Sequence, residues 1–140
     1  MTATEDDGDG LVGQTIIALE CCSPTVRLHT AAGPVWVIDG NDPRSFLSLV
    51  VDEGNLLGGT VLKVDRHLSH SSDGFKKFVF YEPDIPIKTY HECRATTTYT
   101  ITTEKGDAVF RWEAATAGWG KHRRLVGASL MLEQELEGKR

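Results

Sequence analysis

Hydrophobic and polar positions alternate along much of this chain, in segments bounded by glycine or proline. A period of two is typical of strands that bury one face. Segments 26–30 and 35–38 enclose the turn sequence Ala-Ala-Gly-Pro, and segments 99–103 and 108–112 enclose Glu-Lys-Gly-Asp. Each pair predicts a β-hairpin, and the second turn is expected to need one residue with positive φ.

Further strands are expected from segments rich in β-branched and aromatic residues, which suit a pleated surface. These segments are 14–20, 60–65, 75–81 and the threonine-rich 96–103, while 46–51 fits either a strand or a short helical turn. No segment keeps a helical period over three turns. We therefore expect one mainly β domain with about nine short strands and little helix, arranged as a barrel, half-barrel or sandwich.

A short motif, Leu-(Val/Leu)-Gly-x-(Thr/Ser), occurs at 11–15, 56–60 and 125–129. Its two apolar residues are expected to anchor a tight turn in the core. Its glycine supplies a backbone conformation closed to residues with a Cβ atom, and its threonine starts a strand. We interpret the motif as architectural, because a phosphate-binding loop needs more glycines and a following helix.

A second correspondence links residues 26–33 with 99–106, since each is an alternating strand that leads into a glycine turn. The chain is therefore interpreted as two related half-units. The second half-unit carries an insert at about residues 66–94.

Composition and charge set the limits of the domain. The 140 residues fit one domain at 10–133, between an acidic tail at 1–9 that is expected to be disordered and a polar tail at 134–140. The net charge of −5 argues against a general nucleic-acid binder.

No apolar run reaches membrane-spanning length and the N-terminus is acidic, so a cytoplasmic protein with no membrane partner is expected. Three cysteines, of which Cys21 and Cys22 are adjacent, indicate reduced thiols.

The repeated motif, the hairpin at 99–106 and the stretch from Phe110-Arg111-Trp112 to Gly118-Trp119-Gly120 resemble a family of small proteins found mainly in bacteriophages and their hosts. That family is a domain of unknown function. The resemblance covers about two-thirds of the chain and leaves out residues 66–94. It implies a phage or mobile-element setting, with an accessory role such as interference with a host defence, and it implies no known activity.

Histidine and cysteine residues are the weak candidates for a metal site: His67, His70, His91 and Cys93. A structural zinc site needs paired ligands at both ends of a defined spacing, and these residues lack that arrangement. The same region offers a thiol beside a histidine, but nothing in the sequence supplies an oxyanion hole. Neither a metal nor another cofactor is expected.

The segment 111–124 is the best functional candidate. It holds two of the three tryptophans and four of the fifteen Lys and Arg residues of an acidic protein. An exposed tryptophan beside cations suits an anionic ligand or partner, through stacking and charge-assisted hydrogen bonds. The alternative is that Trp119 closes one end of the β core. The candidate binding residues are Arg111, Trp112, Trp119, Lys121, His122, Arg123 and Arg124.

The leading hypothesis is a non-enzymatic binding module that presents the Trp119 loop, and the 66–94 insert, to a protein or a small anionic ligand. One alternative is a small cyclase-like β-barrel enzyme with an apolar pocket. That pocket would be lined by Trp36, Phe78, Tyr99 and Trp112. The other alternative is a structural or oligomeric protein whose exposed strands pair between chains.

Overall fold

The computed structural model describes the backbone of residues 10–40, 45–78, 88–119 and 125–134, and the side chains in these ranges except those of 71–78, 88–92 and 117–119. The protein is mainly β, as the alternating pattern predicts. No helix in the described ranges is long and apolar enough to cross a membrane.

Eight strands are formed by the described residues. They are β1 (Ile16–Cys22), β2 (Thr25–Thr30), β3 (Val35–Asp39), β4 (Phe46–Asp52), β5 (Val61–Phe78), β6 (Lys88–Thr103), β7 (Gly106–Trp119) and β8 (Ser129–Leu132). Both predicted hairpins are present, as β2–β3 and β6–β7. The ambiguous segment 46–51 is the strand β4.

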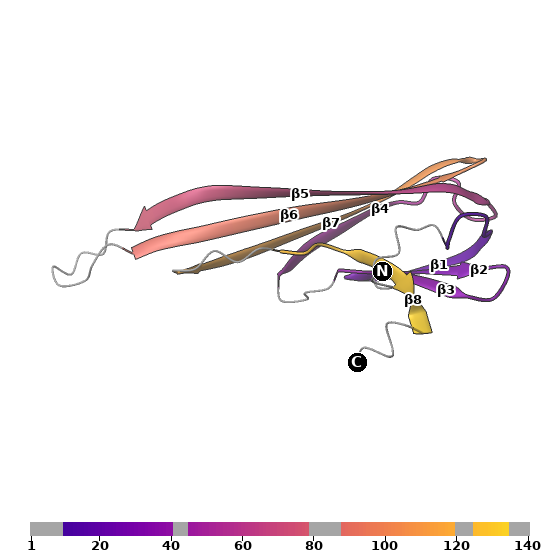
Figure 1. The fold of residues 1–140 in the computed structure, drawn as a ribbon, viewed down its shortest axis with the longest axis horizontal. Coiled ribbons are helices and arrows are strands. Elements are labelled where there is room, and N and C mark those ends of the chain that lie inside the picture. Colours follow the sequence, from indigo (N-terminus) through magenta and orange to yellow (C-terminus); the bar gives the residue numbers. More distant parts are fainter. Residues whose placement is uncertain (1–9, 41–44, 79–87, 120–124, 135–140) are drawn as a thin grey trace.

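The strands form two four-stranded antiparallel sheets, shown in Figure 1, with the orders β1-β2-β3-β8 and β4-β7-β6-β5. In the first sheet, β1, β2 and β3 are consecutive in the chain, and the fourth strand is β8, which pairs with β3. The second sheet consists of the four consecutive strands β4 to β7, but its first strand, β4, pairs with its last, β7. The first sheet is therefore completed only when β8 returns to it after the second sheet.

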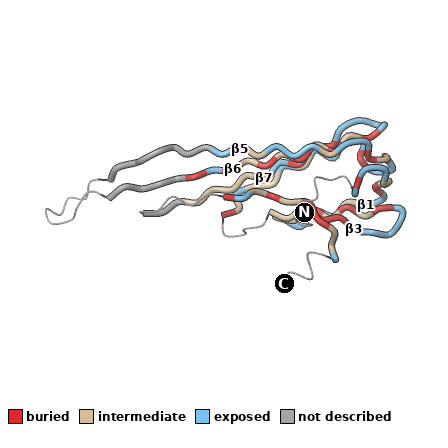
Figure 2. The backbone as a smooth tube through the Cα atoms, in the orientation of Figure 1, coloured by how far each residue is buried: buried red, intermediate tan, exposed pale blue. Residues whose placement is uncertain are grey.

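Both sheets contribute side chains to one hydrophobic core. Val26, Leu28 and Ile38 project from the first sheet, and Tyr99 and Phe110 from the second. All five are buried, because alternate residues of their strands point to the same face. Figure 2 shows the buried residues concentrated where the two sheets face each other.

The two sheets are also linked by backbone hydrogen bonds between residues 11–17 and 56–62, which we call the joint. Thr15 and Thr60 form an antiparallel bridge, and their hydroxyl oxygens lie 3.0 Å apart. The backbone hydrogen bonds on the two sides of this pair join equivalent positions of the two segments. The N–H of Gly13 donates to Val61 at 2.7 Å, and the N–H of Gly58 donates to Ile16 at 2.7 Å. The joint thus has a local two-fold arrangement centred on the two threonines.

The glycine of the repeated motif has a positive φ in every copy, as predicted, with values of +89°, +80° and +75° at Gly13, Gly58 and Gly127. The first apolar residue is buried each time: Leu11, Leu56 and Leu125. The expectation that the second apolar residue also anchors the turn is wrong. That residue is exposed in all three copies: Val12, Leu57 and Val126. One buried leucine and one glycine are enough to hold each turn.

Most of the predicted insert at 66–94 belongs to two long strands. Strand β5 continues to Phe78, β6 begins at Lys88, and the two pair along this length apart from a shift of register between Ser72 and Phe75. Residues 75–78 of the segment 75–81, predicted as a strand of its own, form the end of β5, and the rest of that segment lies outside the described residues. The polar sequence around Ser-His-Ser-Ser resembles a loop, but its partner is a threonine-rich strand that pairs with it through the backbone.

Replacing Tyr99 by phenylalanine tests how the two sheets are held together. The Tyr99 hydroxyl oxygen accepts a hydrogen bond from the buried N–H of Leu130 on β8, at 3.0 Å. Because Tyr99→Phe leaves this donor without its partner, we expect a loss of about 1–3 kcal/mol in the free energy of unfolding, measured by urea denaturation. The control Thr100→Val removes a hydroxyl from the opposite face of β6 and should change stability by less than about 0.5 kcal/mol. Equal losses in the two variants would contradict this account.

Candidate interaction surface

A three-stranded ribbon extends from the body of the protein. It consists of the parts of β5, β6 and β7 at 71–78, 88–94 and 115–119, beyond the level at which β4 pairs with β7. Figure 1 shows these strands projecting away from the first sheet. At about 3.4 Å per residue, the 18 residues of β5 extend for roughly 60 Å. The ribbon therefore presents strand edges at a distance from the core.

Among the described residues, the edge of β7 has no partner strand along the ribbon, and we call this the open edge. The N–H of Ala115 donates to Ser45 at 2.7 Å, and beyond this contact no described strand pairs with β7 on that side. Because N–H groups alternate in direction along a strand, that of Ala117 points to the same open edge. The sequence Ala-Ala-Thr-Ala-Gly at 114–118 contains no charge and no proline. The edge thus lacks the features that usually prevent strand addition.

The other edge of the ribbon, formed by β5, is protected. The sequence of β5 within the ribbon contains three charged residues, Asp73, Lys76 and Lys77. Its pairing with β6 also shifts register between Ser72 and Phe75. Charges and bulges of this kind prevent the regular approach of another strand. The two edges therefore differ, and β7 offers the more favourable one.

A segment that we call the strap, residues 125–128, crosses the inner face of the second sheet at the base of the ribbon. The guanidinium group of Arg66 donates to the carbonyls of Ala128 at 2.9 Å and Val126 at 3.0 Å. Nε2 of His70 lies 2.6 Å from the carbonyl oxygen of Leu125, so this ring nitrogen carries the proton and donates. These contacts fix the segment that leads into β8.

The candidate binding residues predicted from 111–124 are only partly described. Arg111 is exposed on the outer face of β7, with Nε 3.9 Å from Glu113 Oε1. Trp112 points to the opposite face, is buried, and donates its indole N–H to the carbonyl of Pro24 at 2.7 Å. Trp119 ends β7 opposite Tyr90, but its side chain lies outside the described ones. The remaining predicted residues also lie outside the described ranges: Lys121, His122, Arg123 and Arg124.

The weak metal candidates do not assemble in the described part of the chain. His67 and His70 are an odd number of residues apart on β5, so their side chains point to opposite faces. Cys93 is buried, and the side chain of His91 lies outside the described ones. The described residues contain no group of three His, Cys, Asp or Glu that could hold a metal ion.

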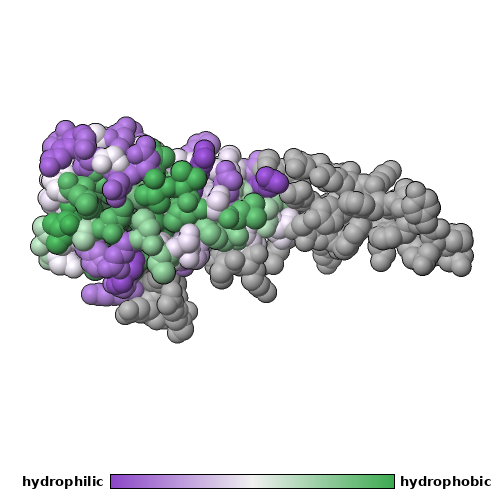
Figure 3. All heavy atoms as spheres, turned by 180° about the vertical axis from the view of Figure 1, so that it is seen from behind, coloured by the Kyte–Doolittle hydropathy of each residue, from purple (hydrophilic) through white to green (hydrophobic). Residues whose placement is uncertain are grey.

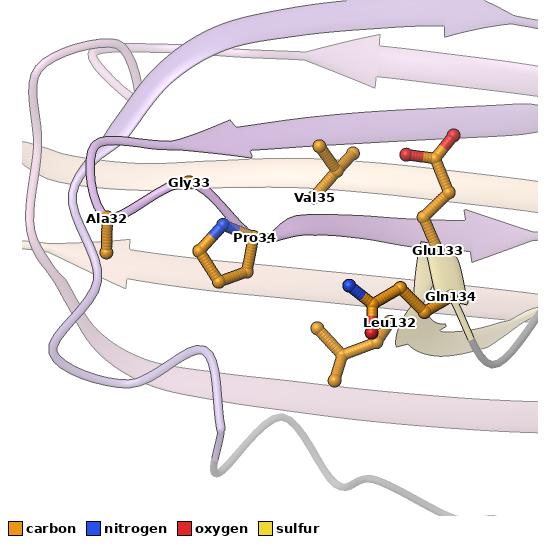
Figure 4. Close-up of a pocket in the computed structure, with 7 residues that line it drawn as sticks. All are labelled: Ala32, Gly33, Pro34, Val35, Leu132, Glu133 and Gln134. Atoms are coloured by element: carbon orange, nitrogen blue, oxygen red, sulfur yellow. The ribbon is translucent and has the colours of Figure 1, made fainter.

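Two hollows that are lined by described residues lie outside the core. The larger, of about 420 Å³, is formed by the β2–β3 turn and the end of β8 (Figure 4). Its one charged side chain, Glu133, forms an ion pair with Arg27, which also binds Glu20 at 3.1 Å. Because two carboxylates neutralise Arg27, this hollow offers no unbalanced cation to an anionic ligand.

The smaller hollow, of about 90 Å³, lies where β4 begins, beside the base of the ribbon. It is lined by Leu47, Arg94, Ala95, Thr96, Glu113 and Ala114. Neither hollow includes the aromatic residues expected to line an enzyme pocket. Trp36, Tyr99 and Trp112 are instead buried in the core, and the side chain of Phe78 lies outside the described ones.

The ribbon edge is the feature that the sequence analysis did not identify as a site. Its sequence signal is the uncharged run at 114–118, which follows a well-patterned strand and contains no turn residue before Gly118. The pattern alone could not show that, in the described residues, β4 begins opposite Ala114 whereas β7 continues to Trp119. This offset depends on pairing between strands far apart in the chain.

Substituting Arg66 tests the strap. Arg66→Met keeps the aliphatic stem but removes the hydrogen bonds to Val126 and Ala128, so we expect a loss of about 1–3 kcal/mol in the free energy of unfolding. Amide hydrogen exchange at Ala128 and Leu130 should also become faster. The control Lys63→Met removes an exposed cation from the outer face of the same strand and should leave both quantities unchanged. Unchanged exchange in the Arg66 variant would show that the strap is held by other contacts.

The thiol of Cys21 provides a pH-dependent test. Partial burial, and then the negative charge of Glu53, raise the pKa of this thiol. Removing the charge by Glu53→Gln should lower the pKa of Cys21, so that more thiolate forms near pH 8 and alkylation by iodoacetamide becomes faster. The rate is measured by mass spectrometry on a Cys22→Ser background, with Glu104→Gln as the control. A rate profile against pH that does not move would refute the role of Glu53.

Comparison of the chain with protein-family models, with curated proteins and with solved structures finds no match.

Proposed function

We propose that this protein is a non-enzymatic binding module whose ribbon binds an extended segment of a partner protein by strand addition to β7. The observation that carries this proposal is the open, uncharged edge of β7 beyond the contact between Ala115 and Ser45. In this mode of recognition, backbone hydrogen bonds supply affinity and pockets for alternate side chains supply specificity.

The surroundings of the edge support such a partner. A strand added to β7 would continue the line of β4, which begins at Phe46. Leu47 is 54% exposed at this point and borders the hollow of about 90 Å³ described above. That hollow has room for a small side chain of the added strand. Arg94 and Glu113, which also line it, offer one charge of each sign to neighbouring residues of the partner.

A protein partner agrees better with these features than the small anionic ligand also expected from the sequence. An open strand edge presents a row of backbone donors and acceptors that matches another extended backbone, whereas an anion requires convergent donors or cations. The resemblance to a phage-associated family suggests that the partner belongs to the host cell of a phage or mobile element.

Proline at position 117 tests the edge directly. Ala117→Pro removes an N–H that points to the open side of β7 and keeps the pairing with β6, so folding should be retained. Ten-residue peptides selected from a display library for binding to the native protein should lose at least tenfold in affinity for this variant, measured by fluorescence anisotropy. Ala117→Val keeps the N–H and should bind them normally.

Two outcomes would decide against the β7 edge. Selected peptides that bind Ala117→Pro as tightly as the native protein would exclude strand addition there. Peptides that lose affinity only for the double variant Trp119→Ala with Arg123→Ala would assign binding to the basic segment that follows β7.

A further inference from the structure

Four large apolar side chains are exposed around the joint. Val12 and Leu57 occupy the second position of the repeated motif and are 41% and 48% exposed. Ile17 and Leu62 lie five residues further along each copy, and both are 57% exposed. We call these four residues the joint patch. Matching positions in the two parts of the joint therefore carry the same type of exposed residue.

The geometry of the joint places these residues together. Thr15 and Thr60 are directly paired, and the two segments run antiparallel from this pair, so Ile17 and Leu62 lie on either side of it. The hydrogen bond from Gly13 to Val61 sets Val12 beside Leu62, and the one from Gly58 to Ile16 sets Leu57 beside Ile17. The joint patch is thus centred on the two threonine hydroxyls and shares the local two-fold arrangement of the joint.

The four side chains of the joint patch do not belong to the hydrophobic core. Each turn already has a buried leucine and a glycine with positive φ, and the four apolar side chains are about half exposed. Single exposed apolar residues are common, but a group of four around one pair of paired segments marks an interaction surface. Figure 3 shows hydrophobic side chains gathered in a band across one face of the body.

The charges around the joint patch indicate which partner fits it. Glu104 accepts a hydrogen bond from the N–H of Thr60 at 2.8 Å, and Lys105 Nζ approaches Gly58. On the other side, Lys63 Nζ lies 3.4 Å from Asp65. This rim carries two positive and two negative residues, although the whole chain has a net charge of −5. Two copies can therefore bring their rims together without the repulsion that their net charge would cause elsewhere.

We infer that the joint patch is the interface through which two copies of this chain form a homodimer. A dimer with two-fold symmetry uses the same surface on both copies, which requires a self-complementary patch with balanced charge. Neither hollow contains a residue of the joint patch, so it fits another flat apolar surface better than an inserted peptide. Four half-exposed side chains bury less surface than the roughly 800 Å² per partner of a standard interface. The dimer is therefore weak and dissociates in the micromolar range.

Dimerisation at this surface is independent of strand addition to β7, because the joint lies in the body and the open edge lies on the ribbon. A dimer would carry two ribbons and could bind two partner segments, or one partner at two places. Loss of the dimer would reduce avidity, and each single ribbon would keep its own affinity.

Sedimentation equilibrium between about 1 and 200 µM protein tests the inference. The native protein should pass from monomer to dimer over this range. The double variant Ile17→Glu with Leu62→Glu should remain monomeric, because it places charges in the apolar patch. The matched control Leu47→Glu with Val50→Glu alters two equally exposed residues on β4 and should dimerise like the native protein. Circular dichroism of both variants at the same concentrations verifies that they are folded.

A second measurement locates the contact. The cysteine introduced by Leu62→Cys, with Cys21 and Cys22 replaced by serine and the buried Cys93 retained, should be joined to its copy by a short bismaleimide in the dimer. The same background with Val50→Cys should give no covalent dimer. A native protein that stays monomeric at 200 µM, a patch variant that still dimerises, or cross-linking at 50 in place of 62 would each overturn the inference.

Discussion

Thr15 and Thr60 lie side by side, and the backbone hydrogen bonds around them determine where β1 and β5 begin. Because these two strands belong to different sheets, the joint holds one sheet against the other through backbone hydrogen bonds, in addition to the packing of core side chains. The alternation along each strand then decides which residues point inward. The position of β8 adds a second constraint, since the first sheet is complete only when this strand, which follows the whole second sheet in the chain, pairs with β3.

Local features of the fold follow from the sequence. The turn containing Gly106 gives the β6–β7 hairpin with φ of +131° at that glycine, and the alternation in β2 predicts which of its residues are buried. These features depend on neighbours within a few residues. The pairing of β4 with β7 and of β8 with β3 could not be derived in this way, because it depends on contacts between residues far apart in the chain.

The candidate site illustrates the same limit. The concentration of tryptophan and basic residues at 111–124 indicated the end of β7 as a candidate site, but composition does not separate Trp112, which is buried, from Arg111 beside it, which is exposed. A strand period of two would have assigned them to opposite faces. The open edge could not be foreseen, since it depends on the register in which the described residues of β4 pair with β7.

The unbroken pairing of β6 with β7 gives the ribbon different responses to force in different directions. From Gly106 to Trp119, every residue of β7 has a partner on β6, and the core residues Phe110 and Trp112 lie within this length. A pull along the strand loads all of these hydrogen bonds together in shear and carries tension to the core. A pull across the ribbon breaks them one at a time, from the end. The ribbon is therefore a stiff tether along its axis and a weak one when it is peeled from the side.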